Sequence, residues 1–150
     1  MFNSNKKLVH QEDTVGRLTC KTCEKWSTVF LITNKHVLTA NHALNKHKKH
    51  FDSLFIEFVT VSAQKYSVNV IKQSVEDDVA ILELNNEVKE IKPLYLDFNQ
   101  VDYNEKWSTF GFPVKKYDFG ERIYGSVSRP VRYFGHRTLP WDTELNCDDF

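Results

Sequence analysis

The stretch Thr-Val-Phe-Leu-Ile-Thr-Asn-Lys-His-Val-Leu-Thr-Ala-Asn-His-Ala-Leu at residues 28–44 decides the fold of this chain. Two apolar runs, at 29–32 and 37–38, flank the turn-forming pair Asn34-Lys35. This pattern predicts a β-hairpin, because β-branched and apolar residues favour strands and asparagine favours turns. The second run leads through small residues to His42, so we expect the hairpin to deliver one histidine to a fixed place.

An acidic residue at the start of another apolar segment gives this histidine a partner. Glu76-Asp77-Asp78 comes directly before the apolar residues 79–84. A lone histidine beside an apolar strand is more often structural than catalytic, so a partner is needed before His42 indicates chemistry. A histidine and an aspartate at the ends of two buried strands indicate two of the three groups of a catalytic triad.

The order of these motifs resembles a known family. The segment Val37-Leu38-Thr39-Ala40-Asn41-His42-Ala43-Leu44 resembles the histidine motif of trypsin-like (chymotrypsin-fold) serine peptidases, and Asp78-Val79-Ala80-Ile81-Leu82 resembles their aspartate motif. Gly111-Phe112-Pro113 and Ile123-Tyr124-Gly125-Ser126-Val127 are similar to strands that open the second barrel in bacterial and intracellular members. An ordered series of matches is more specific than any one of them. The resemblance implies an all-β, trypsin-like double β-barrel.

The strand-like segments divide the chain into an expected N-terminal arm at 1–14, a complete first antiparallel β-barrel at 15–97, and a linker with a partial second β-barrel at 98–150. Short β-branched and aromatic segments between polar turns are typical of such barrels. Beside the hairpin, the expected strands of the first barrel are 15–19, 53–61, 66–71, 80–84 and 92–96. The expected strands of the second are 107–113, 122–128 and 131–135, with a loop at 115–121.

The resemblance assigns catalytic roles to His42 and Asp78. His42 would act as base and then as general acid, since imidazole titrates near neutral pH, and Asp78 would accept a hydrogen bond from its other ring nitrogen. We choose Asp78 over Asp77 because Asp78 directly precedes the strand, as in the resembled motif. His36 lies at the start of its strand, so we expect it to be structural or exposed. We expect no cofactor and no metal, and a protein or peptide as substrate.

The nucleophile is missing from the expected triad. No serine stands in a Gly-x-Ser-Gly turn, and Ser126, which follows Gly125, continues into a strand-like segment. The resemblance implies that the missing turn begins soon after Phe150. Loss of the nucleophile alone lowers the rate on the order of a million-fold in subtilisin.

Three interpretations follow from the missing serine. The favoured one is an N-terminal portion of a longer trypsin-like serine endopeptidase, inert alone and followed by further segments or domains. The others are a non-catalytic protease-like module that binds peptides, and one half of a split enzyme whose partner chain supplies the serine turn.

The composition of the chain limits the classes of binding partner and the cellular location that we expect. Lys and Arg equal Asp and Glu at 20 each, which gives no global preference for nucleic acid or an anionic membrane. The basic run at 45–50 is expected to be solvated loop surface. No apolar window is long enough to span a membrane, and the first residues lack the apolar core of a secretory signal, so we expect a cytoplasmic protein.

The three cysteines are expected to be reduced thiols. Cys20 and Cys23 form a C-x-x-C pair that could be half of a zinc site, but a structural zinc needs four ligands, and only Cys147 with a histidine could complete the set. A turn between two strands is the simpler interpretation of the pair.

Overall fold

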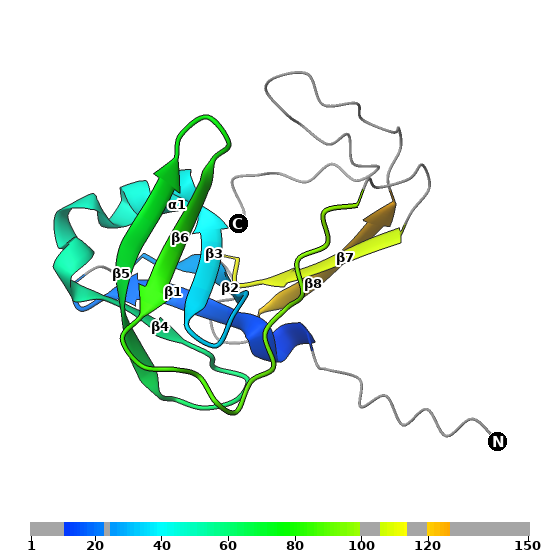
Figure 1. Cartoon of the computed structure of the whole chain (residues 1–150), viewed down its shortest axis with the longest axis horizontal. Coiled ribbons are helices and arrows are strands. Elements are labelled where there is room, and N and C mark those ends of the chain that lie inside the picture. Colours follow the sequence, from blue (N-terminus) through cyan, green and yellow to red (C-terminus); the bar gives the residue numbers. More distant parts are fainter. Residues whose placement is uncertain (1–10, 23–24, 100–105, 114–119, 127–150) are drawn as a thin grey trace.

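The computed structural model of the chain describes residues 11–22, 25–99, 106–113 and 120–126 (Figure 1). Strands dominate the described part, which confirms the all-β expectation. In chain order the elements are η1 Gln11–Thr14, β1 Val15–Cys20, β2 Ser27–Leu31, β3 His36–Ala40, α1 Asn41–Leu44, η2 Asn45–Ser53, β4 Leu54–Glu57, β5 Lys65–Ser74, β6 Val79–Leu84, β7 Lys106–Gly111 and β8 Glu121–Ser126.

Six strands form a closed barrel in the order β1-β2-β3-β6-β5-β4, and every pair in it is antiparallel. The barrel closes where β1 pairs with β4, with Arg17 opposite Glu57. Closure leaves no unpaired edge in this sheet. The expected complete first barrel is therefore confirmed. Strands β7 and β8 form a separate two-stranded sheet, which lies beside the barrel as the start of the expected second unit (Figure 1).

The predicted hairpin is present as β2 and β3. Its register places Phe30 opposite Leu38, and the backbone N–H of Ile32 donates to the carbonyl of His36 at 2.9 Å. The hydroxyl of Thr33 accepts from the backbone N–H groups of Lys35 and His36 at 3.1 and 2.9 Å. This side-chain turn satisfies the donors that the reversal frees, so the turn forms where the sequence predicts it.

The core fills the inside of the barrel. In β2, β3 and β6 buried side chains alternate with partly exposed ones, as expected for strands with one face inside a barrel. The fully enclosed apolar side chains include Leu18, Val29, Leu31, Val37, Ile56, Phe58, Leu82, Leu84 and Val88. Burying each of them contributes roughly 1.5–3 kcal/mol, so the core fixes the register of the strands that carry the site.

Replacement of Leu82 by alanine is expected to lower the free energy of unfolding by about 2–5 kcal/mol, because Leu82 is fully buried and its loss leaves a cavity. The neighbouring Ile81 lies on the outer face of the same strand and is only partly buried, so Ile81→Ala is the matched control. Urea unfolding measures both. Equal losses in the two variants would contradict the assigned register of β6.

Two predicted strands differ from those observed. Residues 92–96 are not a strand; Leu94 makes one backbone hydrogen bond, from its N–H to the carbonyl of Leu31 at 2.8 Å. The barrel closes with six strands, so it has no edge left for this segment, and Pro93 lacks an N–H to donate. The strand predicted at 53–61 ends at Glu57, because the chain turns there and the N–H of Val61 donates to the carbonyl of Phe58 at 2.9 Å.

Three other predicted segments are either helical in the structure or lie partly or wholly outside the described residues. The basic run at 45–50 belongs to η2, a 3-10 helix, rather than to an irregular loop. Of the loop predicted at 115–121, residues 115–119 lie outside the described residues and Glu121 already begins β8. The strand predicted at 131–135 also lies outside them.

Gly125 and Arg122 on strand β8 make contacts that depend on their residue types. Gly125 lies opposite Trp107, and a Cβ there would come within 2.2 Å of the Trp107 ring, so the indole covers a site that only glycine leaves open. Arg122 donates to the carboxylate of Glu12 in η1 at 2.9 and 3.0 Å and to the hydroxyl of Ser108 at 3.1 Å. These contacts tie the second sheet to the segment that leads into β1.

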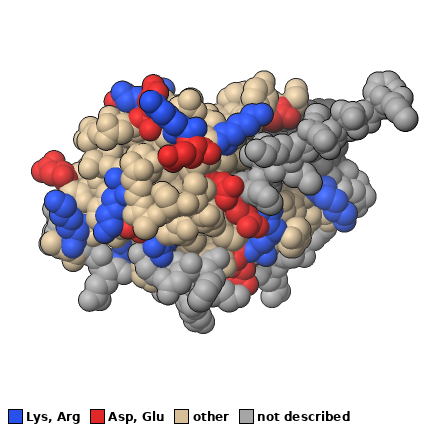
Figure 2. Space-filling model, turned by 90° about the horizontal axis from the view of Figure 1, so that it is seen from below, with Lys and Arg blue, Asp and Glu red and all other residues tan. Residues whose placement is uncertain are grey.

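The expectation of reduced cysteines is wrong for Cys20, which is buried and disulfide-bonded. Cys23 and Cys147 lie outside the described residues. In the part of the chain that the structure describes, no helix is long and apolar enough to cross a membrane. On the face in Figure 2, Lys and Arg are interspersed with Asp and Glu, so the described residues present no extended patch of one sign there.

Candidate active site

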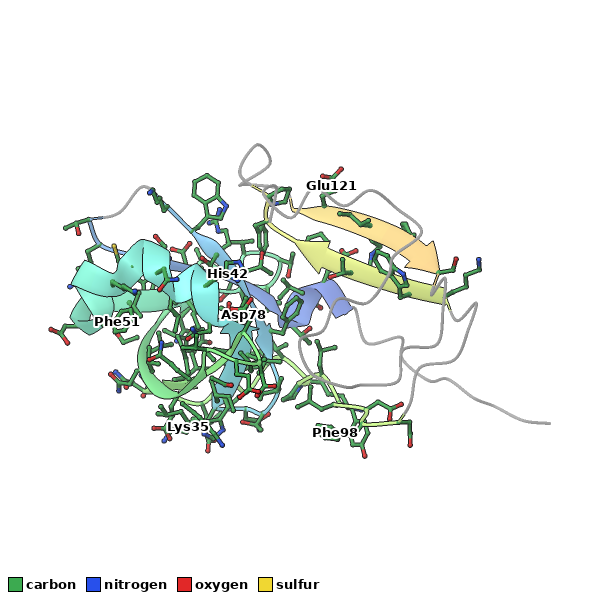
Figure 3. The ribbon with its side chains drawn as sticks, turned by 90° about the horizontal axis from the view of Figure 1, so that it is seen from above. Lys35, His42, Phe51, Asp78, Phe98 and Glu121 are labelled. Carbon is green, nitrogen blue, oxygen red and sulfur yellow. The ribbon has the colours of Figure 1, made fainter. Side chains whose placement is uncertain are left out.

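The pairing of β3 with β6 brings His42 and Asp78 together. Ala40, the last residue of β3, lies opposite Val79, the first residue of β6. Because the strands are antiparallel, the residue before Val79 and the first turn of α1 meet at the same end of the barrel. Figure 3 labels His42 and Asp78 side by side at this end. The sequence places the two residues 36 positions apart, and the sheet register alone makes them neighbours.

The Asp78 carboxylate holds His42 at two points. Its Oδ2 lies 2.6 Å from Nδ1 of the imidazole, and its Oδ1 accepts the backbone N–H of His42 at 2.8 Å. The backbone N–H of Asn41 donates to the carbonyl of Asp78 at 3.1 Å. An ionised carboxylate only accepts hydrogen bonds, so Nδ1 carries the proton and the Nε2 lone pair is directed elsewhere. The imidazole side chain is 61% exposed, which leaves Nε2 open to a reacting group.

Asp78 adopts a backbone conformation that is uncommon for a side chain of its type. Its φ is +51°, in the left-handed region, where aspartate and asparagine are tolerated better than most residues. This turn aims both carboxylate oxygens back at residue 42. Asp77 instead makes local contacts with Ser74, whose hydroxyl donates to Oδ2 of Asp77 at 2.9 Å and accepts the Asp77 N–H at 3.2 Å. The carboxylate of Asp78 therefore bonds to His42, whereas that of Asp77 bonds to Ser74.

The surroundings of Asp78 lower its pKa. Partial burial by itself would raise the pKa of this carboxyl, but the hydrogen bonds from the backbone and ring of His42, the charge of His42 and the Asn41 amide together hold it below its ordinary value of 3.8. Hydrogen bonds donated to a carboxylate favour its charged form. The carboxylate therefore stays ionised at any pH at which the imidazole could act as a base.

A lowered pKa in the folded state makes stability depend on pH. The contribution of Asp78 is fully present above the unfolded-state pKa and is lost as pH falls through the lower folded-state pKa, because protonation breaks the bonds to His42. We expect unfolding free energies measured between about pH 5 and pH 2 to fall less steeply in Asp78→Asn than in the unchanged chain. Parallel curves for the two proteins would contradict the assigned bonds.

The competing candidates lie elsewhere. His36 is at the opposite end of β3, where its Nδ1 is 2.8 Å from the Thr33 hydroxyl and its Nε2 is 3.9 Å from Glu83. This agrees with the structural role expected from the sequence. Ser126 is the last residue of β8, paired with Lys106, and so lies in a strand rather than a nucleophile turn.

One polar contact beside the site was not predicted. The side-chain amide of Gln73 on β5 donates to Oδ1 of Asn41 at 3.0 Å. The backbone N–H of the same asparagine donates to the carbonyl of Asp78. A register shift in the pairing of β5 with β6, between Val70 and Lys72, precedes Gln73. Regular alternation in the sequence gives no sign of such a shift, so the sequence could not assign Gln73 to this end of the barrel.

Over residues 11–22, 25–99, 106–113 and 120–126, no three His, Cys, Asp or Glu side chains are grouped as a metal ion requires. The zinc arrangement considered for Cys20 and Cys23 depends on residues outside these ranges. The oriented imidazole of His42 can support proton transfer.

A closed antiparallel barrel joined to a second sheet, with a paired histidine and aspartate at one end, defines the class of double-barrel, trypsin-like proteins. The model of the trypsin-like peptidase domain family matches residues 26–148, and the chain belongs to this family. The sequence matched none of the curated proteins with which it was compared.

Solved structures show the same fold at low sequence identity. Deg5 superposes with a TM-score of 0.70 at 17% identity, over 92% of this chain and 71% of that chain. The Rv3671c protease of M. tuberculosis H37Rv, in its inactive form, gives a TM-score of 0.61 at 16% identity over 93% and 60%. Kallikrein-related peptidase 10 gives 0.64 at 16% over 79% and 59%. The chain thus spans about three fifths of the length of two of these proteins.

Proposed function

We propose that residues 1–150 form the part of a trypsin-like serine endopeptidase that carries the general base and the acid that orients it. The single observation that carries this proposal is the double contact of one Asp78 carboxylate with the ring and the backbone of His42. Membership of the peptidase family supports it. The substrate class is a protein or peptide, and the proposed division of the chain is 1–14, 15–97 and 98–150.

In the proposed reaction, Nε2 of His42 takes the proton of a serine hydroxyl as that oxygen attacks the substrate carbonyl. Asp78 stabilises the imidazolium that forms and keeps its Nδ1 proton in place. The same imidazolium then protonates the leaving amine. The exposed ring and the fixed Nδ1 contact suit this sequence of steps, since one nitrogen is held while the other exchanges protons.

The serine and the oxyanion donors are proposed to come from polypeptide beyond Phe150. The absence of a Gly-x-Ser-Gly turn from residues 1–150 also fits a second candidate, a protease-like module that binds peptides without cleaving them, or half of a split enzyme. The cytoplasmic setting expected from the sequence is part of the proposal, and cell fractionation tests it.

The intact mass of the native protein, with peptide sequencing across Phe150, tests the proposal. A mass well above 17.6 kDa with a Gly-x-Ser-Gly turn soon after Phe150 is the expected result. A mass equal to that of this chain would contradict the endopeptidase proposal and leave the binding module or the split enzyme. Hydrolysis that appears only on mixing with a second chain would identify the split enzyme.

A further inference from the structure

Three consecutive residues, Trp26 and the first two residues of β2, connect the second sheet to the site. Trp26, Ser27 and Thr28 are here called the clasp. The indole Nε1 of Trp26 donates to the carbonyl of Phe112 at 3.0 Å, and the N–H of Phe112 donates to the hydroxyl of Thr28 at 3.1 Å. Both backbone groups of Phe112 are thus satisfied by side chains more than 80 residues away in the sequence.

Packing contacts also hold the side chain of Phe112 in place. Its side chain is 2% exposed, its ring meets Phe110 edge to face at 5.5 Å, and the Arg17 guanidinium lies 5.7 Å from its centroid. Arg17 is itself held by Glu57 at 3.0 Å. The apolar cluster here consists of Val15, Phe110 and Phe112 with Trp26, Phe30 and Val59 against them. The end of β7 therefore has one position against the barrel.

The other contacts of the clasp reach the residues on both sides of His42. The hydroxyl of Thr39, near the end of β3, donates to the carbonyl of Thr28 at 2.8 Å. The buried hydroxyl of Ser27 donates to the carbonyl of Ala43, directly after His42, at 3.4 Å. The Thr39 side chain, before the histidine, is thus bonded to Thr28, and the backbone of Ala43, after it, is bonded to Ser27. Thr28 also holds Phe112, and Ser27 directly precedes Thr28.

We propose that the clasp is a positioning element, which sets the second sheet at a fixed place relative to the imidazole of His42. This rests on the proposed function: groups that the second unit contributes must meet Nε2 in reacting geometry. A displacement of about 1 Å at a reacting centre can cost roughly 100-fold in rate. Glycine at residues 26–28 could make none of the side-chain bonds, so the clasp depends on these particular side chains.

The test uses Thr28→Val and Trp26→Phe in the native protein, which remove one hydrogen bond each and keep most of the packing. Thr60→Val is the matched control, because Thr60 is exposed and its hydroxyl donates to the carbonyl of Glu12, at 3.4 Å, rather than to Phe112 or a neighbour of His42. The first readout is NMR: exchange of the Phe112 amide and the ring signals of His42. The second is the split between kcat and KM for peptide hydrolysis.

In the two clasp variants we expect Phe112 amide exchange to become about 10-fold faster, together with a shift of the His42 ring signals. We also expect kcat to fall about 10–100-fold with KM within about threefold. Faster exchange with His42 signals and kcat as in Thr60→Val would overturn the proposal, and so would unchanged exchange. If the native protein hydrolyses no peptide, the proposed function fails and the NMR readout decides the clasp by itself.

Discussion

Replacement of His42 by alanine is expected to abolish peptide hydrolysis by the native protein while leaving its fold intact. The expected loss in kcat is on the order of a million-fold, the effect of removing the corresponding histidine from subtilisin. The loss is this large because the His42 imidazole, held by Asp78, is the proposed base of the reaction. Without His42 the serine keeps its proton and attacks only at the rate of a neutral hydroxyl.

Stability should change little in this variant. The imidazole is 61% exposed, and the backbone N–H of residue 42 still donates to Asp78. Surface substitutions of this kind usually alter the free energy of unfolding by less than about 0.5 kcal/mol. His36→Ala is the matched control, since it removes a histidine from the other end of the same strand and should leave turnover unchanged. Equal turnover in His42→Ala and the unchanged protein would refute the assignment.

Asp78→Asn is expected to lower kcat about 10⁴-fold, the effect of the corresponding substitution in trypsin. Asparagine tolerates the left-handed backbone at residue 78, so the turn should persist. Its side-chain amide, however, can donate to Nδ1 of His42 and select the tautomer whose Nε2 carries the proton. Such an imidazole cannot take a proton from serine.

The neighbouring acid provides the control for this variant. Asp77→Asn removes one negative charge at almost the same place, but the side chain and backbone N–H of Asp77 bond to the Ser74 hydroxyl. Steady-state kinetics should therefore show near-normal kcat in Asp77→Asn and a large loss in Asp78→Asn, with KM similar in both. A loss shared equally by the two variants would indicate a general effect of charge and would contradict the role of Asp78.

The hairpin and the start of β6 could be predicted because each depends on a local pattern. Two apolar runs on either side of the pair Asn34-Lys35 define the β2–β3 hairpin, and a polar run directly before an apolar one marks the start of β6. The pairing of β3 with β6 could not be computed from these patterns. It came from the resemblance to a family whose motifs occur in the same order.

The failures have a common physical cause, which is tertiary context. Residues 92–96 have strand-like composition, but a barrel that already closes offers them no partner. The basic residues of η2 carry no apolar periodicity that would reveal a 3-10 helix. The clasp joins residues 84 and 86 positions apart, a distance over which a single sequence gives no signal.

The most direct measurement of the central claim is labelling of the native protein with a fluorophosphonate, which bonds to a serine hydroxyl that a nearby base has activated. We expect one labelled serine, located by peptide mass spectrometry in a Gly-x-Ser-Gly turn beyond Phe150, and no labelling of His42→Ala. A native protein that takes up no label, or a His42→Ala variant labelled as fast as the unchanged protein, would contradict the claim that His42 and Asp78 activate a serine.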